Sequence, residues 1–290
     1  MRNTRKKELS RRSFIKIGTT AATVFSIVPG HVVGANGKTP PSEKLNIAGI
    51  GIGGMGMGNI GACKGENVVA LCDVDSAYAG KTFKAHPNAA TYVDYRLMLE
   101  KQKDIDAVVI ATPDHTHAVI TMAAIEMGKH VYCQKPLTHT VEEARKITAA
   151  ARASKVQTQM GNQGHSSDAI RVVREWVQSG SIGDVKEVHA WTDRPDDGPW
   201  YANFGARDLP SDFPAVPDSL NWDLWLGPTQ DRKFSPAYHP FKWRAWLDFG
   251  TGALGDMGCH ILDPACWALD LMNPSSITAE VKHHKPELAG

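Results

Sequence analysis

The chain has 290 residues, 42% of them hydrophobic, with 32 basic and 31 acidic side chains. Residues 1–35 carry seven of the basic residues and one Glu, so the rest of the chain has 25 basic and 30 acidic residues and a formal net charge of −5. This negative balance argues against nucleic acid or an anionic membrane surface as a partner. The five cysteines show no CxxC spacing, and their odd number does not suggest a disulfide framework.

The first 35 residues have the pattern of an export signal. Arg11 and Arg12 are flanked by Ser, Phe and Lys, a weakly apolar stretch runs from residue 17 to residue 29, and a small-residue site ends at Ala35. This pattern predicts a Tat signal, cleaved near Ala35, and a periplasmic location. An uncleaved anchor is the alternative, but the apolar stretch is short for a membrane span, so no integral segment is expected after cleavage. Residues 36–43 are interpreted as a linker.

Residues 44–165 alternate between short apolar runs and amphipathic stretches, which predicts a doubly wound parallel sheet in an α/β domain. Strands are expected at 45–50, 67–72, 107–112, 130–133 and 156–160, and helices at 115–127 and 141–153.

A glycine motif follows the first expected strand. Gly51 allows a tight turn, Gly53 allows the backbone to approach a pyrophosphate, and Gly56 allows the next helix to pack on the strand. The phosphates would lie at the positive end of that helix. Asp73, 20 residues past Gly53, is placed to accept the ribose hydroxyls of NAD, and its charge disfavours the extra phosphate of NADP. The alternative is an ordinary strand-to-helix turn.

Parallel sheets bind ligands at the carboxyl ends of their strands. Three segments are expected at that edge: the glycine loop, residues 111–117 and residues 133–136. The residues predicted to contact NAD are Gly51, Gly53, Gly54, Met55, Gly56, Asp73, Thr112, Pro113, His117, Gln134 and Lys135.

A second domain is predicted over residues 166–290. A helix is expected at 167–179, and alternating polarity over 183–191 predicts a strand in a sheet with one solvated face. The aperiodic stretch 195–250 is rich in tryptophan, which favours an ordered, functional loop. A helix at 254–271 and a strand at 276–282 follow. Because a single strand leaves an open edge and a bare apolar face, we expect this domain to be incomplete, the chain to be truncated, and residues 36–290 to aggregate or oligomerise.

Two groups could carry chemistry. Asp256 and His260 are spaced i, i+4 on one helix face, with Asp263 one turn on, which suits a carboxylate-oriented general base. A surface ion pair and a metal site are the alternatives; no clear third ligand is nearby, so no metal is predicted. Lys135 follows a buried strand and could stabilise a developing alkoxide, or it could be a surface lysine.

These motifs together resemble the glucose–fructose oxidoreductase / inositol dehydrogenase (Gfo/Idh/MocA) family over residues 44–282. They are GxGxxG, Ala-Thr-Pro-x-x-x-His, Gln-Lys-Pro-Leu, and Gly-x-Leu-x-Asp-x-Gly-x-His-x-x-Asp. The resemblance implies an N-terminal Rossmann domain and a C-terminal α/β domain with an open, mostly antiparallel sheet. It also implies that Lys135, Asp256 and His260 are active-site residues. One departure is Gln134, where the family has Glu.

The family's usual chemistry implies hydride transfer between a nicotinamide and a sugar, polyol or glycoside hydroxyl. In this interpretation His260 accepts the proton, Asp256 holds His260 and Lys135 stabilises the oxygen. An exported enzyme is expected to retain its NAD, and the full-length protein is expected to be a homo-oligomer. Glycoside cleavage by transient oxidation and elimination, or a non-catalytic sugar-binding fragment, are the alternatives. Candidate contacts to the carbohydrate are Asn162, His165, Tyr238, Trp243 and Arg244.

Overall fold

The computed structural model describes residues 39–194 and 209–280, in two units that are considered separately: Met1–Lys44 and Leu45–Gly290. The described residues of the first unit contain one 3-10 turn, η2 (Pro41–Glu43). The predicted signal segment, the start of the linker, Trp200 and the last two residues of the predicted 276–282 strand lie outside the described residues. Within the described ranges, no helix is both long enough and apolar enough to cross a membrane.

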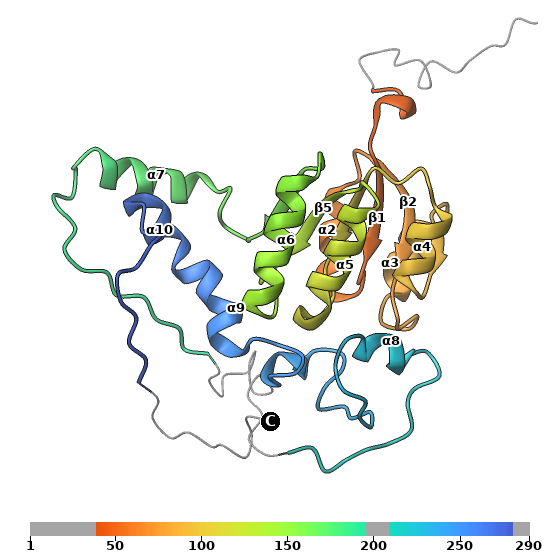
Figure 1. Cartoon of the computed structure of the whole chain (residues 1–290). Helices are drawn as coiled ribbons and strands as arrows, with labels where there is room; N and C mark the ends of the chain where they lie inside the picture. The colour runs from red at the N-terminus through yellow and green to blue at the C-terminus, as the bar shows by residue number, and fades with distance from the viewer. Residues whose placement is uncertain (1–38, 195–208, 281–290) are drawn as a thin grey trace, which may run out of the picture. The chain divides into compact units, whose positions relative to one another are not determined.

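The second unit contains a six-stranded parallel sheet in the order β3-β2-β1-β4-β5-β6; Figure 1 labels β1, β2 and β5 in it. The chain winds outward in both directions from β1, so the boundary between β1 and β4 is the point at which such sheets bind ligands. The strands are β1 (Asn46–Ile50), β2 (Asn67–Cys72), β3 (Ala90–Tyr92), β4 (Ala107–Ile110), β5 (His130–Gln134) and β6 (Thr158–Gly161). The helices between them are α2 (Gly54–Ala62), α3 (Gly80–Ala85), α4 (Tyr95–Lys101), α5 (Asp114–Glu126) and α6 (Val141–Ala153).

Both faces of the sheet are covered, because alternate residues of each central strand enter different cores. Ala70 and Cys72 of β2 pack with the helices α4, α5 and α6. Leu71, between them, packs on the opposite face with Ile60 of α2. This two-sided burial explains why the central strands are nearly continuous apolar runs. The predicted doubly wound sheet is therefore confirmed, although the three-residue strand β3 was not anticipated.

Residues 219–250, called here the aromatic segment, form a separate core. It includes α8 (Trp222–Leu226) and the 3-10 helix η3 (Lys242–Ala245). Its buried members are Leu220, Trp222, Trp225, Leu226, Phe234, Tyr238, Trp243, Trp246 and Phe249. The prediction that most of these tryptophans make an ordered segment is confirmed. Without a regular strand or long helix, the segment is held together by ring-on-ring packing such as the stacked Trp222–Trp225 pair at 4.6 Å.

The aromatic segment is tied to the carboxyl edge of the sheet at three places. Asn221 N donates to Val74 O at 2.8 Å, beside an isolated antiparallel bridge between Asp75 and Leu220. His239 Nε2 lies 2.8 Å from Asp75 Oδ2. The ring of His115, on α5, contacts two carbonyl oxygens of the segment. The segment therefore packs over the edge where β1 and β4 end.

The remaining helices are α7 (Asp168–Gln178), α9 (Gly252–Ile261) and α10 (Asp263–Leu269). Helices α7 and α10 lie against each other (Figure 1), and Arg174 of α7 donates to Trp267 O and covers the Trp267 ring at 4.7 Å. The predicted helix 254–271 is thus two helices. Pro264, in the first turn of α10, has no N–H to continue α9, so the break falls just before it.

Two strand predictions in the second domain are wrong for the described residues. Residues 183–191 and 276–280 form no strand, and Trp191 and Ile277 are 78% and 82% exposed. An alternating sequence forms a strand only when a neighbouring strand supplies hydrogen bonds, and the described part of the chain places none beside these segments. The antiparallel sheet expected here is accordingly not formed by the described residues.

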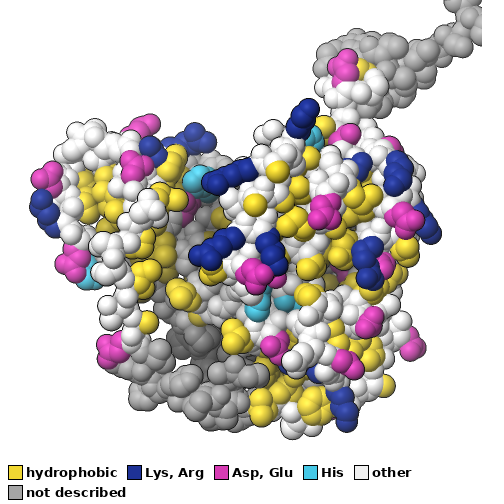
Figure 2. All heavy atoms as spheres, in the orientation of Figure 1, with side chains coloured by type: hydrophobic (Ala, Val, Ile, Leu, Met, Phe, Trp, Pro, Cys, Tyr) yellow, Lys and Arg dark blue, Asp and Glu magenta, His cyan; other side chains and the backbone are white. Residues whose placement is uncertain are grey.

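On the face seen in Figure 2, acidic and basic side chains are interspersed rather than gathered by sign.

Candidate active site

The β1–α2 turn has the geometry that the glycine motif predicts. Gly51 has φ +72°, and a Cβ there would lie 2.7 Å from Thr112. A Cβ on Gly56 would lie 1.9 Å from Gly51 O, so a side chain would separate α2 from β1. At Gly53 the obstacle is only the ring of Tyr78, 2.2 Å from a Cβ. The turn therefore needs its first and third glycines for packing, and leaves the second facing a movable side chain.

Asp73 closes the same turn from the end of β2. Its Oδ2 accepts hydrogen bonds from Ile52 N at 2.8 Å and Gly53 N at 3.1 Å, and its Oδ1 accepts one from Asp75 N. Burial raises the pKa of Asp73, and these three N–H groups oppose the rise. The carboxylate is thus fixed in orientation beside the glycine loop, where an adenosine ribose binds in sheets of this order.

A cavity of about 760 Å³ extends from Asp73 and the glycine loop across the ends of β4 and β5 to α9. Its size suits a cofactor-sized ligand, and the aromatic segment forms one wall. Residues predicted for the site that line it are Gly51, Gly53, Gly54, Met55, Asp73, Thr112, Pro113, His117, Gln134, Lys135, Trp243, Arg244, Asp256 and His260. The loop and Asp73 at one end and polar side chains at the other fit an extended dinucleotide.

Lys135 and Asp256, 121 residues apart, form an ion pair in this cavity. Lys135 Nζ donates to Asp256 Oδ1 at 2.7 Å and to Asp256 O at 2.9 Å. Arg194 Nη1 donates to the other carboxylate oxygen at 2.8 Å. Burial opposes ionisation of Asp256, but the hydrogen bond and charge of Lys135, aided by Arg244 and Arg194, hold its pKa below the usual range. Both side chains are largely buried, so Lys135 has a defined position.

The expectation that Asp256 orients His260 is wrong. The i, i+4 spacing does put both residues on one face of α9, but the carboxylate is engaged by Lys135 and Arg194. Burial lowers the pKa of His260, and the charge of Lys135 lowers it further. The backbone of Gln163 and the carboxylate of Asp256 each favour the protonated ring and oppose the lowering of the His260 pKa. The pKa is lowered overall, so the ring is neutral near pH 7 and can accept a proton.

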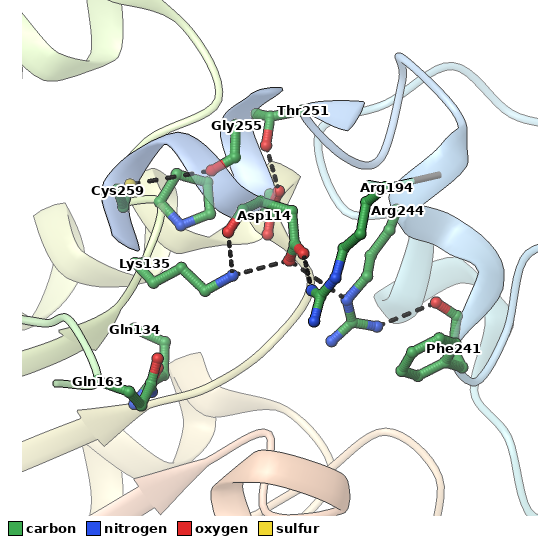
Figure 3. Close-up of polar contacts among 12 residues, drawn as sticks. Asp114, Gln134, Lys135, Gln163, Arg194, Phe241, Arg244, Thr251, Gly255 and Cys259 are labelled. Carbon is green, nitrogen blue, oxygen red and sulfur yellow. Dashed lines mark hydrogen bonds and ion pairs between the residues drawn. The ribbon is translucent and has the colours of Figure 1, made fainter. Parts of the chain in front are cut away.

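Gln134 connects three elements beneath this group. Its Nε2 donates to Asn59 Oδ1 on α2 at 3.0 Å, and its Oε1 accepts from Gln163 Nε2 at 2.6 Å. Figure 3 shows the two glutamine amides in contact. The amide at position 134 therefore links the glycine-loop helix to the loop that follows β6. A carboxylate at this position could not donate to Asn59.

His117 supports the turn that carries Lys135. It is fully buried, with Nδ1 2.7 Å from Pro136 O and Nε2 2.8 Å from Thr112 O. Two carbonyl acceptors favour a doubly protonated ring. Burial disfavours that charge, but interactions with Cys133, Asp114 and Pro136 O raise the pKa of His117 to about 9. His117 lines the cavity, yet its polar atoms bind the protein, so its contribution is to position the two loops.

Three of the residues predicted to contact carbohydrate do not line the cavity. Asn162 Nδ2 donates to Cys259 O at 2.8 Å, and His165 Nδ1 lies 2.8 Å from Asp263 Oδ2, so both connect the end of β6 to α9 and α10. Tyr238 is buried in the aromatic core. Trp243 and Arg244 do line it. The first three positions remain predictions as substrate contacts, without support from cavity geometry.

Four residues of the site were not anticipated from the sequence: Arg194, Asp114, Asp75 and His239. Arg194 and His239 come from aperiodic stretches that gave no positional signal. Asp114 lay within a motif already singled out, and it accepts a hydrogen bond from Thr251 Oγ1 at 2.8 Å. Asp75, two residues past Asp73, was given no role.

Comparison with known proteins agrees with this geometry. Residues 45–162 match the family model described as "Oxidoreductase family, NAD-binding Rossmann fold" (GFO_IDH_MocA), and residues 168–289 match its "C-terminal alpha/beta domain". The chain belongs to the Gfo/Idh/MocA oxidoreductase family. Its N-terminal domain is an NAD-binding Rossmann fold, followed by the family's C-terminal α/β domain.

Relatives match over part of their length. Levoglucosan dehydrogenase of Pseudarthrobacter phenanthrenivorans is 28% identical over 59% of this chain and 35% of its own. Inositol 2-dehydrogenase of Serratia proteamaculans is 30% identical over 54% of this chain and 48% of its own. The solved structure of an oxidoreductase domain protein from Kribbella flavida shares 28% identity, with a TM-score of 0.57, over 78% of this chain and 54% of that one. The chain thus spans less than half the length of these two dehydrogenases.

Proposed function

We propose that this chain carries the NAD site and the catalytic side chains of a dehydrogenase acting on a hydroxyl of a sugar, polyol or glycoside. The observation that carries the proposal is the Lys135–Asp256 ion pair beside His260, in the same cavity as the glycine loop and Asp73. The names of the relatives, dehydrogenases of levoglucosan and inositol, support the same class of substrate.

The side chains divide the work as follows. His260 takes the proton of the substrate hydroxyl, because its lowered pKa keeps the ring neutral. Lys135 donates a hydrogen bond to the same oxygen and stabilises the negative charge that develops there. Asp256 orients Lys135 through the 2.7 Å contact. When bound, NAD supplies the acceptor for the hydride.

The test is a panel of sugars and polyols followed at the nicotinamide absorbance, with NAD binding measured by calorimetry. His260→Ala should lower kcat/KM by about 10²–10⁴-fold and leave NAD affinity unchanged, and Lys135→Met should lower kcat/KM to a similar extent. The exposed His189→Ala is the matched control. Wild-type rates in both site variants would contradict the assignment. Aglycone release without net change in NADH would indicate oxidation followed by elimination instead, and sugar binding without turnover would indicate a non-catalytic protein.

The cofactor is proposed to stay bound and to be recycled in place. The aromatic segment supports this, because it forms a wall of the cavity and is tied to the sheet through Asp75 and His115. Native mass spectrometry of purified protein should show NAD at stoichiometric occupancy, and the same spectra report whether the full-length protein is a homo-oligomer, as proposed. Complete loss of NAD during gel filtration would contradict retention.

Export by the Tat pathway to the periplasm is proposed on the sequence around Arg11 and Arg12. N-terminal analysis of the secreted protein should begin just after Ala35. Replacing both arginines by lysine should leave the precursor in the cytoplasm. Periplasmic protein from the lysine variant, or an intact N-terminus on exported protein, would contradict the proposal.

A further inference from the structure

Arg244 is held rigidly at the cavity wall. It lies on η3, and its guanidinium packs on two aromatic rings, 4.3 Å from the centroid of Phe241 and 4.2 Å from that of Trp243. Its Nη1 donates to Phe241 O at 3.0 Å, and its Nε lies 3.8 Å from Asp256 Oδ1. The third nitrogen, Nη2, has no hydrogen-bond partner among the described residues. Planar stacking of this kind fixes the donor direction of an arginine before a ligand arrives.

Three cationic side chains and two carboxylates meet in the corner of the cavity that contains Arg244. Figure 3 shows Lys135, Arg194 and Arg244 directed toward one region, and all three pair with the single carboxylate of Asp256. The other described carboxylate in this corner of the cavity, Asp114, has its pKa raised by burial. Burial lowers the pKa of Arg244 and Arg194 lowers it further, while Asp256, Asp114 and Tyr78 oppose the shift. A further anion in this corner would stabilise the cationic group.

We propose that the substrate is a sugar acid, whose carboxylate binds the guanidinium of Arg244 next to Arg194 while its reacting hydroxyl faces Lys135 and His260. A planar carboxylate matches the fork of guanidinium donors better than a neutral hydroxyl does. Arg244 lies close to the catalytic pair, so one pyranose ring can reach both. The inference rests on the proposed dehydrogenase activity and narrows its substrate class to uronates.

The test compares matched ligands on the NAD-loaded protein. Glucuronate should bind at least about tenfold more tightly by calorimetry than its methyl ester or glucose, since a charge-assisted hydrogen bond contributes about this factor or more. The ratio of kcat/KM between galacturonate and galactose should show the same preference. Arg244→Gln should reduce both preferences to within about threefold, Arg244→Lys should retain part of them, and the exposed helix variant Arg171→Gln should change neither.

Several results would overturn the inference. Equal binding of glucuronate and its ester by the wild-type protein would do so without any variant. Sugar phosphates preferred over uronates by tenfold would assign the site to a different anion. An Arg244→Gln protein with weakened NAD affinity and an unchanged acid preference would place Arg244 at the cofactor diphosphate. If no sugar of any kind is oxidised, the proposed activity fails, and the calorimetric comparison of acid and ester still decides the anion site.

Discussion

Replacing His115 by Phe should loosen the aromatic segment from the sheet and remove part of its sensitivity to acid. His115 Nε2 lies 2.9 Å from Trp225 O and Nδ1 3.2 Å from Phe249 O, and its ring packs 5.2 Å from the rings of both residues. A phenyl ring keeps this packing. It leaves Trp225 O without its partner, whereas Phe249 O still accepts the backbone N–H of residue 115.

The expected change in the free energy of unfolding has two parts. An unpaired buried carbonyl costs about 1–3 kcal/mol, so the variant should be less stable than wild type by that amount at pH 7. Burial lowers the pKa of His115 to about 4; the contacts with Trp225 O and Phe249 O oppose this shift, and His139 and His117 add smaller contributions that lower the pKa. Because the folded pKa is below the unfolded value of about 6.5, His115 contributes stability above pH 6.5 that is lost as the pH falls toward 4. Over that range the loss is about 3 kcal/mol, and His115→Phe should abolish it.

The assay is urea unfolding at pH 7 and pH 5, followed by tryptophan fluorescence, since four tryptophans lie in the described aromatic segment. His189→Phe, whose side chain is 75% exposed, is the control. The difference in unfolding free energy between the wild-type protein and His115→Phe should become smaller as the pH falls from 7 to 5. A difference independent of pH would refute the assignment of a neutral, buried His115 as the anchor.

Three further outcomes test the site. Gly56→Ala should weaken NAD binding at least about tenfold in calorimetry, because its Cβ would lie 1.9 Å from Gly51 O. The control is Gly58→Ala, whose Cβ would have no atom within 4 Å; it should bind NAD normally and be about 0.5–1 kcal/mol more stable. Asp73→Ala should relax the preference for NAD over NADP in a competition assay, with the lost hydroxyl partner and the lost repulsion each contributing about 1–3 kcal/mol; an unchanged ratio would place Asp73 away from the ribose. The folded pKa of His117 is about 9, so its protonated ring contributes about 3 kcal/mol of stability below pH 6.5, and this contribution is lost as the pH rises through 9. In His117→Gln the free energy of unfolding should therefore not show this decrease between pH 6.5 and 9.

The sequence alone determined most of the Rossmann half. Each buried strand is a local apolar run, and the turn after Ile50 needs glycine at positions where a Cβ would strike backbone, so short windows contain the information. The position of Asp73 follows from the same windows, because the end of β2 is adjacent to β1 in any sheet of this order. Lys135 was likewise placed correctly at the end of a strand.

The tertiary structure decided which groups meet. Helical spacing predicted that Asp256 pairs with His260. Instead, Lys135, which follows β5, and Arg194, from an aperiodic stretch, form ion pairs with the Asp256 carboxylate. The alternation over residues 183–191 predicted a strand that depends on a neighbour elsewhere in the chain. The rings of the aromatic segment have no sequence period, because each packs against partners chosen by shape. Contacts between distant residues carry no local signature, and the chemistry of this cavity is made almost entirely of such contacts.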